Sequence, residues 1–139
     1  MIRIKGILLI TFGLFTLGAF AQDCDGVVRE CQRLLTKGDF ISDGQVYTAF
    51  LDRERAEFKT TLYGGTTYRI AASAGTKDDF VLFSIKDPEG HTLFSNRNYK
   101  NAPYWDFRVE ETIPVVIETE LDLDLKTSGC VVMMIGFKR

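Results

Sequence analysis

The longest regular pattern in this chain is a strict alternation of side-chain character over residues 115–125. One face carries Val115, Ile117, Thr119, Leu121, Leu123 and Leu125, and the other carries Val116, Glu118, Glu120, Asp122, Asp124 and Lys126. Successive side chains of a β-strand point to opposite faces, so this period of two predicts a strand with one face in a core and one in solvent. Antiparallel sheets are the ones that expose a polar face, which favours an antiparallel fold.

Shorter segments of the same character occupy most of the remaining chain. We expect further strands over residues 45–51, 56–63, 67–73, 80–86, 91–95, 105–109 and 130–137. Gly64-Gly65 predicts a hairpin between the second and third of these strands, and the turn sequence Asp87-Pro88-Glu89-Gly90 predicts another.

A single helix is expected before these strands. Apolar residues recur at helical spacing over residues 24–37, and Gly38 is a suitable stop. The predicted fold is all-β, an antiparallel jelly-roll-like β-sandwich of about eight strands with one short N-terminal α-helix. We assign residues 22–41 to the helical segment and residues 42–139 to the sandwich.

The first 21 residues have the organisation of a secretory signal peptide. Arg3 and Lys5 give a basic start, residues 7–20 are mostly apolar, and Ala19-Phe20-Ala21 is a small-x-small cleavage signal. The apolar core, about fourteen residues, is shorter than the roughly 20 that a transmembrane helix needs. We therefore expect a secreted or periplasmic protein, cleaved near Ala21 and without a membrane span.

Loss of this segment makes the chain more acidic. Its two positive charges are removed, so the formal net charge of −2 becomes −4. A nucleic-acid-binding domain would need a concentrated basic face, so nucleic acid is excluded as the expected partner.

Three cysteines remain, Cys24, Cys31 and Cys130, and in an oxidising compartment two of them should pair. Seven helical positions separate Cys24 from Cys31, which is about 10 Å and beyond the roughly 7 Å limit for a disulfide. Cys130 is therefore the expected partner of one of them. We favour a structural Cys31–Cys130 bridge and leave Cys24–Cys130 as the alternative.

The run from Glu57 to Ile70, together with Asp78-Asp79-Phe80-Val81-Leu82 and the Asp87-Pro88-Glu89-Gly90 turn, resembles the bacterial pre-peptidase C-terminal domain. The resemblance covers roughly residues 45–137. It implies a jelly-roll-like sandwich and an accessory binding role beside secreted enzymes. This chain would be a stand-alone form, because it carries no peptidase domain.

Catalytic and metal-binding patterns are scarce. His91 is the only imidazole, it follows a turn, and no Gly-x-Ser-x-Gly elbow accompanies it, so no enzyme is expected. The cysteines and the single histidine do not have zinc-ligand spacing. Calcium is the one cofactor with candidate ligands, Asp78 and Asp79, whereas Asp122 and Asp124 continue the polar face of a strand.

The connection over residues 96–105 is the candidate ligand site. Its residues Asn98, Tyr99, Asn101 and Tyr104 interleave amides with aromatic rings, which suits stacking and hydrogen bonding to a sugar or peptide. The alternative is a surface crossover in which Trp105 begins the next core strand.

The predicted function is that of a secreted, non-enzymatic binding or accessory module for a glycan or a cell-envelope protein. A structural or assembly component of the envelope that uses free strand edges is the alternative. A small hydrolase that uses His91 as its base is the third.

Overall fold

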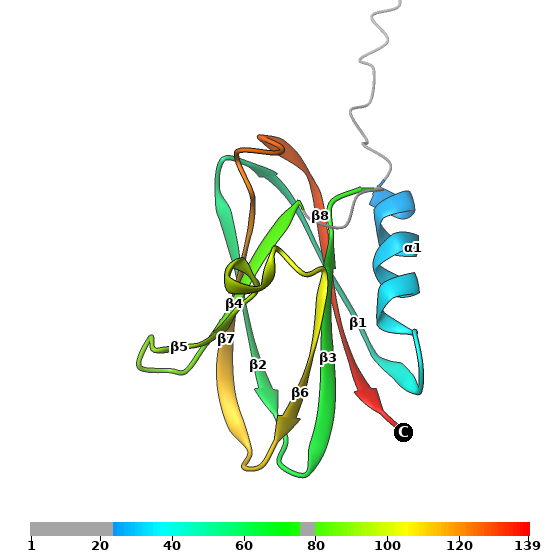
Figure 1. Ribbon diagram of the computed structural model, residues 1–139, viewed down its shortest axis with the longest axis vertical. Coiled ribbons are helices and arrows are strands. Elements are labelled where there is room, and N and C mark those ends of the chain that lie inside the picture. The colour runs from blue at the N-terminus through cyan, green and yellow to red at the C-terminus, as the bar shows by residue number, and fades with distance from the viewer. Residues whose placement is uncertain (1–23, 76–79) are drawn as a thin grey trace, which may run out of the picture.

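The computed structural model describes residues 24–75 and 80–139 (Figure 1). The predicted signal peptide and the proposed calcium ligands Asp78 and Asp79 lie outside these residues. None of the helices within the described ranges is long and apolar enough to span a membrane.

Two four-stranded sheets form the body of the molecule, and every strand pair is antiparallel. Sheet A has the order β1-β8-β3-β6 and sheet B has the order β2-β7-β4-β5. The strands are β1 (Phe40–Asp52), β2 (Arg55–Leu62), β3 (Thr66–Ser73), β4 (Val81–Lys86), β5 (Thr92–Ser95), β6 (Tyr104–Val109), β7 (Ile113–Leu121) and β8 (Ser128–Lys138). This division of eight strands between two sheets is that of a jelly roll, which confirms the predicted fold class.

The core lies between the sheets, and β7 shows how the alternating pattern builds it. Its inward side chains from Val115 to Leu121 are at most 3% exposed. The alternation does not continue to Leu125, because the chain turns at Asp122, whose carbonyl accepts hydrogen bonds from Leu125 N and Lys126 N, each 2.9 Å long. The prediction that Leu123 and Leu125 face the core is therefore wrong, and they are 50% and 48% exposed.

The Gly64-Gly65 connection joins the two sheets, so the predicted hairpin between its flanking strands is also wrong. β2 pairs with β7 in sheet B, whereas β3 pairs with β6 and β8 in sheet A. Gly64 lies against the β6–β7 turn so closely that a Cβ there would be 2.7 Å from the carbonyl oxygen of Glu110. Gly65 has a φ of +82° and donates from its N–H to the carbonyl of Val109.

The predicted turn at Asp87-Pro88-Glu89-Gly90 does form a hairpin, between β4 and β5. Asp87 N donates to the carbonyl of His91 and Gly90 N donates to the carbonyl of Asp87, both at 3.0 Å. The two strands β4 and β5 are thus neighbours both in the chain and in the sheet. Their hairpin projects from the edge of sheet B (Figure 1).

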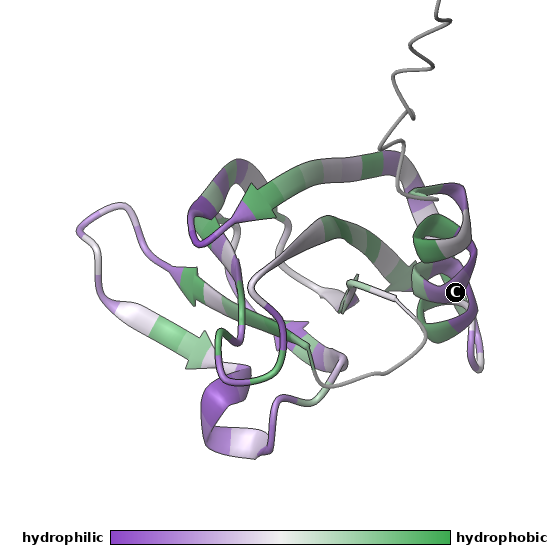
Figure 2. Ribbon diagram, turned by 90° about the horizontal axis from the view of Figure 1, so that it is seen from above, coloured by the Kyte–Doolittle hydropathy of each residue, from purple (hydrophilic) through white to green (hydrophobic). Residues whose placement is uncertain are grey.

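Helix α1 (Cys24–Leu35) covers the outer face of sheet A (Figures 1 and 2). It forms a second apolar cluster with that face, made of Val27, Cys31, Leu34, Leu35, Ala71, Cys130, Val132 and Met134. Gly136 of β8 permits the close approach, because a Cβ there would lie 2.9 Å from Leu35 Cδ1 and 2.7 Å from the carbonyl oxygen of Ile41. Helix α1 thus buries the outer face of β3 and β8, whereas the outer side chains of β1 at Val46 and Phe50 stay exposed and sheet B has a polar outer face.

The disulfide joins Cys24 to Cys130, with 5.8 Å between the Cα atoms, so the favoured Cys31–Cys130 pairing is wrong. Helix α1 and β8 run side by side in the same direction (Figure 1), and Cys24 begins α1 while Cys130 lies near the start of β8. Cys31 lies about 10 Å further along the helix. Its thiol is fully buried, unpaired and directed at the carbonyls of Ala71 and Val132, 3.4 and 3.6 Å away.

Candidate functional site

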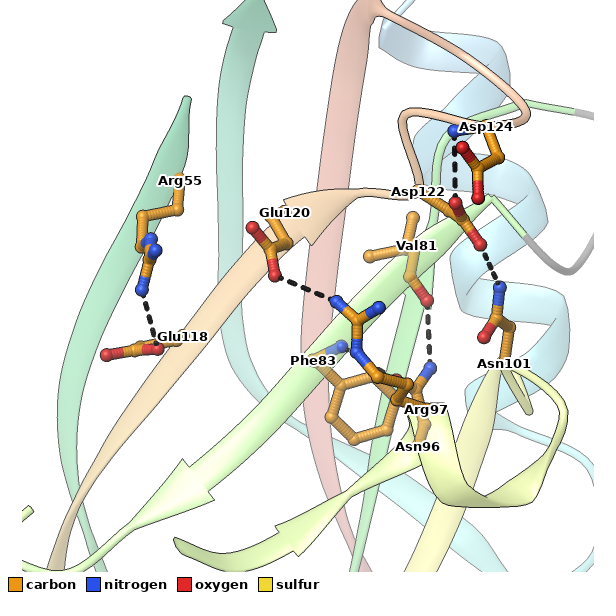
Figure 3. Close-up of polar contacts among 10 residues, drawn as sticks. All are labelled: Arg55, Val81, Phe83, Asn96, Arg97, Asn101, Glu118, Glu120, Asp122 and Asp124. Atoms are coloured by element: carbon orange, nitrogen blue, oxygen red, sulfur yellow. Dashed lines mark hydrogen bonds and ion pairs between the residues drawn. The ribbon is translucent and has the colours of Figure 1, made fainter. Parts of the chain in front are cut away.

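The candidate connection between β5 and β6 is anchored at its first residue, Asn96. This side chain is fully buried. Its Oδ1 accepts a hydrogen bond from Phe83 N at 2.9 Å, and its Nδ2 donates to the carbonyls of Val81 at 2.8 Å and Ala102 at 3.0 Å (Figure 3). Asn96 begins a single 3-10 turn, η1 (Asn96–Tyr99). One amide thus holds both ends of the connection to β4, which fixes the intervening residues on the scaffold.

Tyr99 is the outermost member of an aromatic stack at the open edge between the sheets. Its ring centroid lies 4.3 Å from that of Trp105 and 5.5 Å from that of Phe94. Phe94 in turn contacts Phe107 at 5.0 Å. Trp105 packs against the core, as the crossover alternative predicts, while Tyr99 remains 49% exposed. The structure therefore holds the ring of Tyr99 from behind and leaves part of it open to solvent.

Asn101 fastens the connection to the turn that follows β7. Its Nδ2 donates to Asp122 Oδ2 at 2.8 Å, and Asp122 Oδ1 accepts from Asp124 N at 3.1 Å (Figure 3). Lys100 and Asn101 both have a φ of 55°, which tightens the chain just before this contact. The carboxylate of Asp122 therefore holds the turn together. Asn101 is half-buried, whereas Asn98 is the exposed amide among the predicted ligand residues.

Tyr104 lies on the opposite face of β6 from Trp105, at the junction between sheet A and α1. Its ring covers the guanidinium of Arg69 at 4.4 Å, and Phe40 covers the same group at 4.0 Å. Arg69 is only 6% exposed and forms two hydrogen bonds, 2.7 and 3.1 Å long, with the carboxylate of Asp106. The four predicted ligand residues therefore do not converge: Asn98 and Tyr99 present a surface, whereas Asn101 and Tyr104 have structural contacts.

Two shallow hollows flank the connection. One, of about 510 Å³, is lined by Ala102, Pro103, Tyr104, Trp105 and Asp106. The other, of about 240 Å³, is lined by Leu82, Arg97 and the five residues 120–124. Arg97 reaches across this second hollow to Glu120, with 3.4 Å between Nη2 and Oε1 (Figure 3). The surroundings of Tyr99 thus offer a cation, carboxylates and amides, which are the groups that hydrogen-bond hydroxyls.

The polar outer face of sheet B is organised around Glu118. Its carboxylate lies 2.9 Å from Lys86 Nζ and 3.4 Å from Arg55 Nη1, the second contact being drawn in Figure 3. The hydrogen bond from Lys86 lowers the pKa of Glu118, and the charge of Arg55 acts in the same direction against the effect of partial burial. The carboxylate therefore stays charged at neutral pH.

His91 is exposed, as its place beside a turn suggests. Its Nδ1 lies 2.9 Å from Asp87 Oδ2, and its backbone N–H donates to Asp87 Oδ1 at 2.8 Å. Burial raises the pKa of Asp87, but the hydrogen bonds from the backbone and ring of His91 outweigh it and lower that pKa. Asp87, Glu89 and His91 hold their potential ligand atoms within 4.8 Å, the one such group in the part of the chain described. All three belong to one exposed turn, and Asp87 is already engaged in forming it.

The chain matches no protein-family model, and no curated protein is similar to it in sequence. The resemblance to the pre-peptidase C-terminal domain therefore stays a prediction.

Proposed function

We propose that this protein is an exported, non-enzymatic binding module that recognises a glycan at the β5–β6 connection. The observation that carries the proposal is the state of Tyr99, whose ring is half exposed although Trp105 and Phe94 support it from behind. An aromatic ring held in this way offers a flat apolar face at little cost in side-chain entropy. The apolar face of a pyranose ring is a ligand of matching shape.

The polar groups around Tyr99 suit the hydroxyls of a sugar. Asn98 is exposed beside it, and Arg97 and Glu120 border the adjacent hollow. Loops carried by a rigid scaffold commonly hold binding residues, and Asn96 makes this connection part of the scaffold. A protein partner buries about 800 Å² on each side, whereas a single supported ring with a few polar neighbours matches the size of one sugar unit, so the glycan is favoured.

Export is supported by the cysteines. The Cys24–Cys130 disulfide suits an oxidising compartment such as the periplasm or the extracellular space. The jelly-roll topology is also the fold that the resemblance to pre-peptidase C-terminal domains implies, and an accessory role beside secreted enzymes agrees with a binding module.

A glycan array followed by calorimetry tests the proposal. We expect Tyr99→Ala to weaken binding at least about tenfold, equivalent to ~1.4 kcal/mol, and Tyr99→Phe to keep most of the affinity. Tyr63→Ala is the matched control, because Tyr63 is 61% exposed in the β2–β3 connection. Equal binding by Tyr99→Ala and the wild type, or no binding to any glycan, would refute the proposal.

A further inference from the structure

Strand β1 leaves one side of sheet A unpaired. It lies at the end of the sheet order, and among the described strands it pairs only with β8. Residues 46–52 form an uninterrupted ladder opposite residues 128–134, whereas the register shifts between Ser42 and Val46. The free edge therefore has a regular half, residues 46–52, and a bulged half around Gly44.

Up to Leu51, the regular half lacks the charged and proline residues that usually protect a free edge. No charged residue and no proline lies between Val46 and Leu51. Val46 and Phe50 point to the outer face of sheet A beside α1 and are 46% and 54% exposed. Natural edge strands are commonly shielded by lysine, proline, a bulge or a covering element, so an open, uncharged edge of this kind indicates a pairing surface.

We propose that β1 pairs with β1 of a second copy of this chain, antiparallel and about a two-fold axis at Thr48. The two sheets A would then join into one continuous sheet. Val46 of each copy would lie opposite Phe50 of the other, on the same outer face, with Cβ atoms about 4.5–5.5 Å apart. The exposed side chains of Val46 and Phe50 would be buried against each other twice, once on each side of the axis.

The sequence of β1 favours this register over its neighbours. A shift by one residue would oppose outward to inward side chains, because the side-chain period of a strand is two. A shift by two residues would place Val46 opposite Thr48 or Asp52, which leaves Phe50 without an apolar partner. Only the register centred on Thr48 pairs both exposed apolar residues.

Charge complementarity supports the same register at the ends of the strand. Arg53 follows directly after β1 and lies 3.7 Å from Asp52 of its own chain, and in the proposed register it would approach the bulged half of the other copy, which carries Asp43. The strand therefore complements itself, as an interface with two-fold symmetry requires, and this argues for a second copy over a foreign strand.

Analytical ultracentrifugation of the exported, disulfide-bonded protein tests this pairing. We expect a concentration-dependent dimer that Phe50→Lys and Val46→Lys each weaken at least tenfold. Leu123→Lys is the control, because Leu123 is equally exposed, at 50%, in the β7–β8 turn. Circular dichroism and thermal melting establish that each variant is folded. If one of the two β1 variants does not fold, the other alone tests the pairing.

A charge exchange tests the register itself. Arg53→Asp should weaken the dimer, and adding Asp43→Arg should restore it, which a merely local effect on the bulge would not do. Backbone amides of residues 46–52 should also become protected from hydrogen exchange as the protein concentration rises. A monomer at every concentration, or a dimer insensitive to the β1 variants, overturns the proposal. A monomer that binds a strand of another protein through β1 also overturns the proposal.

Discussion

Replacement of Arg69 by methionine should be among the most destabilising single changes in sheet A. Its Nη1 donates to the carbonyl oxygens of Leu34 at 3.2 Å and Lys37 at 2.6 Å, at the C-terminal end of α1. Methionine keeps much of the apolar stem but supplies no donor, so these carbonyls lose their partner. The change therefore separates the hydrogen bonds of Arg69 from its packing.

The expected cost follows from the individual contacts. A hydrogen bond from a charged donor contributes about 1.5–3 kcal/mol, and Arg69 makes two to the helix end. The ion pair with Asp106 adds at most ~1 kcal/mol, because that carboxylate is 42% exposed and screened by water. Allowing for partial rehydration of the carbonyl of Lys37, we expect a loss of about 3–4 kcal/mol in the free energy of unfolding.

Urea denaturation at pH 7 with the disulfide intact measures this loss. Asp106→Asn is the matched control, since it removes the ion pair alone and should cost about 1 kcal/mol or less. The cost of Arg69→Lys in the free energy of unfolding should fall between those of Arg69→Met and Asp106→Asn. One ammonium cannot form hydrogen bonds with the carboxylate and both carbonyls at the same time. A cost below about 1 kcal/mol for Arg69→Met would refute the assignment of Arg69 as the cap of α1.

Four further predictions concern single sites. Thr119→Val should stabilise the protein by about 1 kcal/mol in urea, because the buried Thr119 hydroxyl has no hydrogen-bond partner among the residues described, and a loss of stability would contradict this. Burial raises the pKa of the Cys31 thiol to about 12, so a thiol reagent at pH 8 should label it only after unfolding, and rapid labelling of the native protein would disprove its burial. Lys86 lowers the pKa of Glu118, so the stability that this carboxylate contributes is present above its unfolded pKa of about 4.3 and is lost as the pH falls through its lower folded value. The difference in stability between Glu118→Gln and the wild type should be up to ~1 kcal/mol at pH 7 and should shrink steadily as the pH is lowered below about 4.3, and a difference that does not depend on pH would contradict this. Gly64→Ala should cost about 1–3 kcal/mol in thermal or urea unfolding, because its Cβ would meet the β6–β7 turn, and a neutral effect would show that this turn yields easily.

The sequence was sufficient to predict elements that rest on local chemistry. Alternation predicted the buried face of β7, and the Asp87–Gly90 turn predicted its hairpin, because both depend on residues next to each other in the chain. The helix was also predicted, although β1 begins at Phe40, two residues before the predicted start of the sandwich. The Asp43-Gly44-Gln45 stretch resembles a loop in sequence but is a bulge within that strand.

The errors concern contacts between distant parts of the chain. Gly64-Gly65 suits a tight turn, and local chemistry alone does not reveal that it crosses between sheets against the β6–β7 turn. The choice between Cys24 and Cys31 depended on the direction of α1 relative to β8, which no local pattern encodes.

The candidate site was predicted in part for the same reason. The aromatic and amide content of residues 96–105 pointed to the connection, but only the fold separates the exposed Tyr99 from Tyr104, which packs on Arg69. Arg69 itself was missed, since a charged residue in an alternating strand usually faces water, and here α1 covers it.

The most direct test of glycan recognition by Tyr99 is an NMR titration of the labelled protein with soluble chito-, cello- and manno-oligosaccharides. We predict that the largest chemical-shift changes occur at Asn98, Tyr99 and the indole N–H of Trp105, and that they disappear in Tyr99→Ala. Saturable shifts confined to another surface, such as the outer face of sheet B around Glu118, would contradict the account.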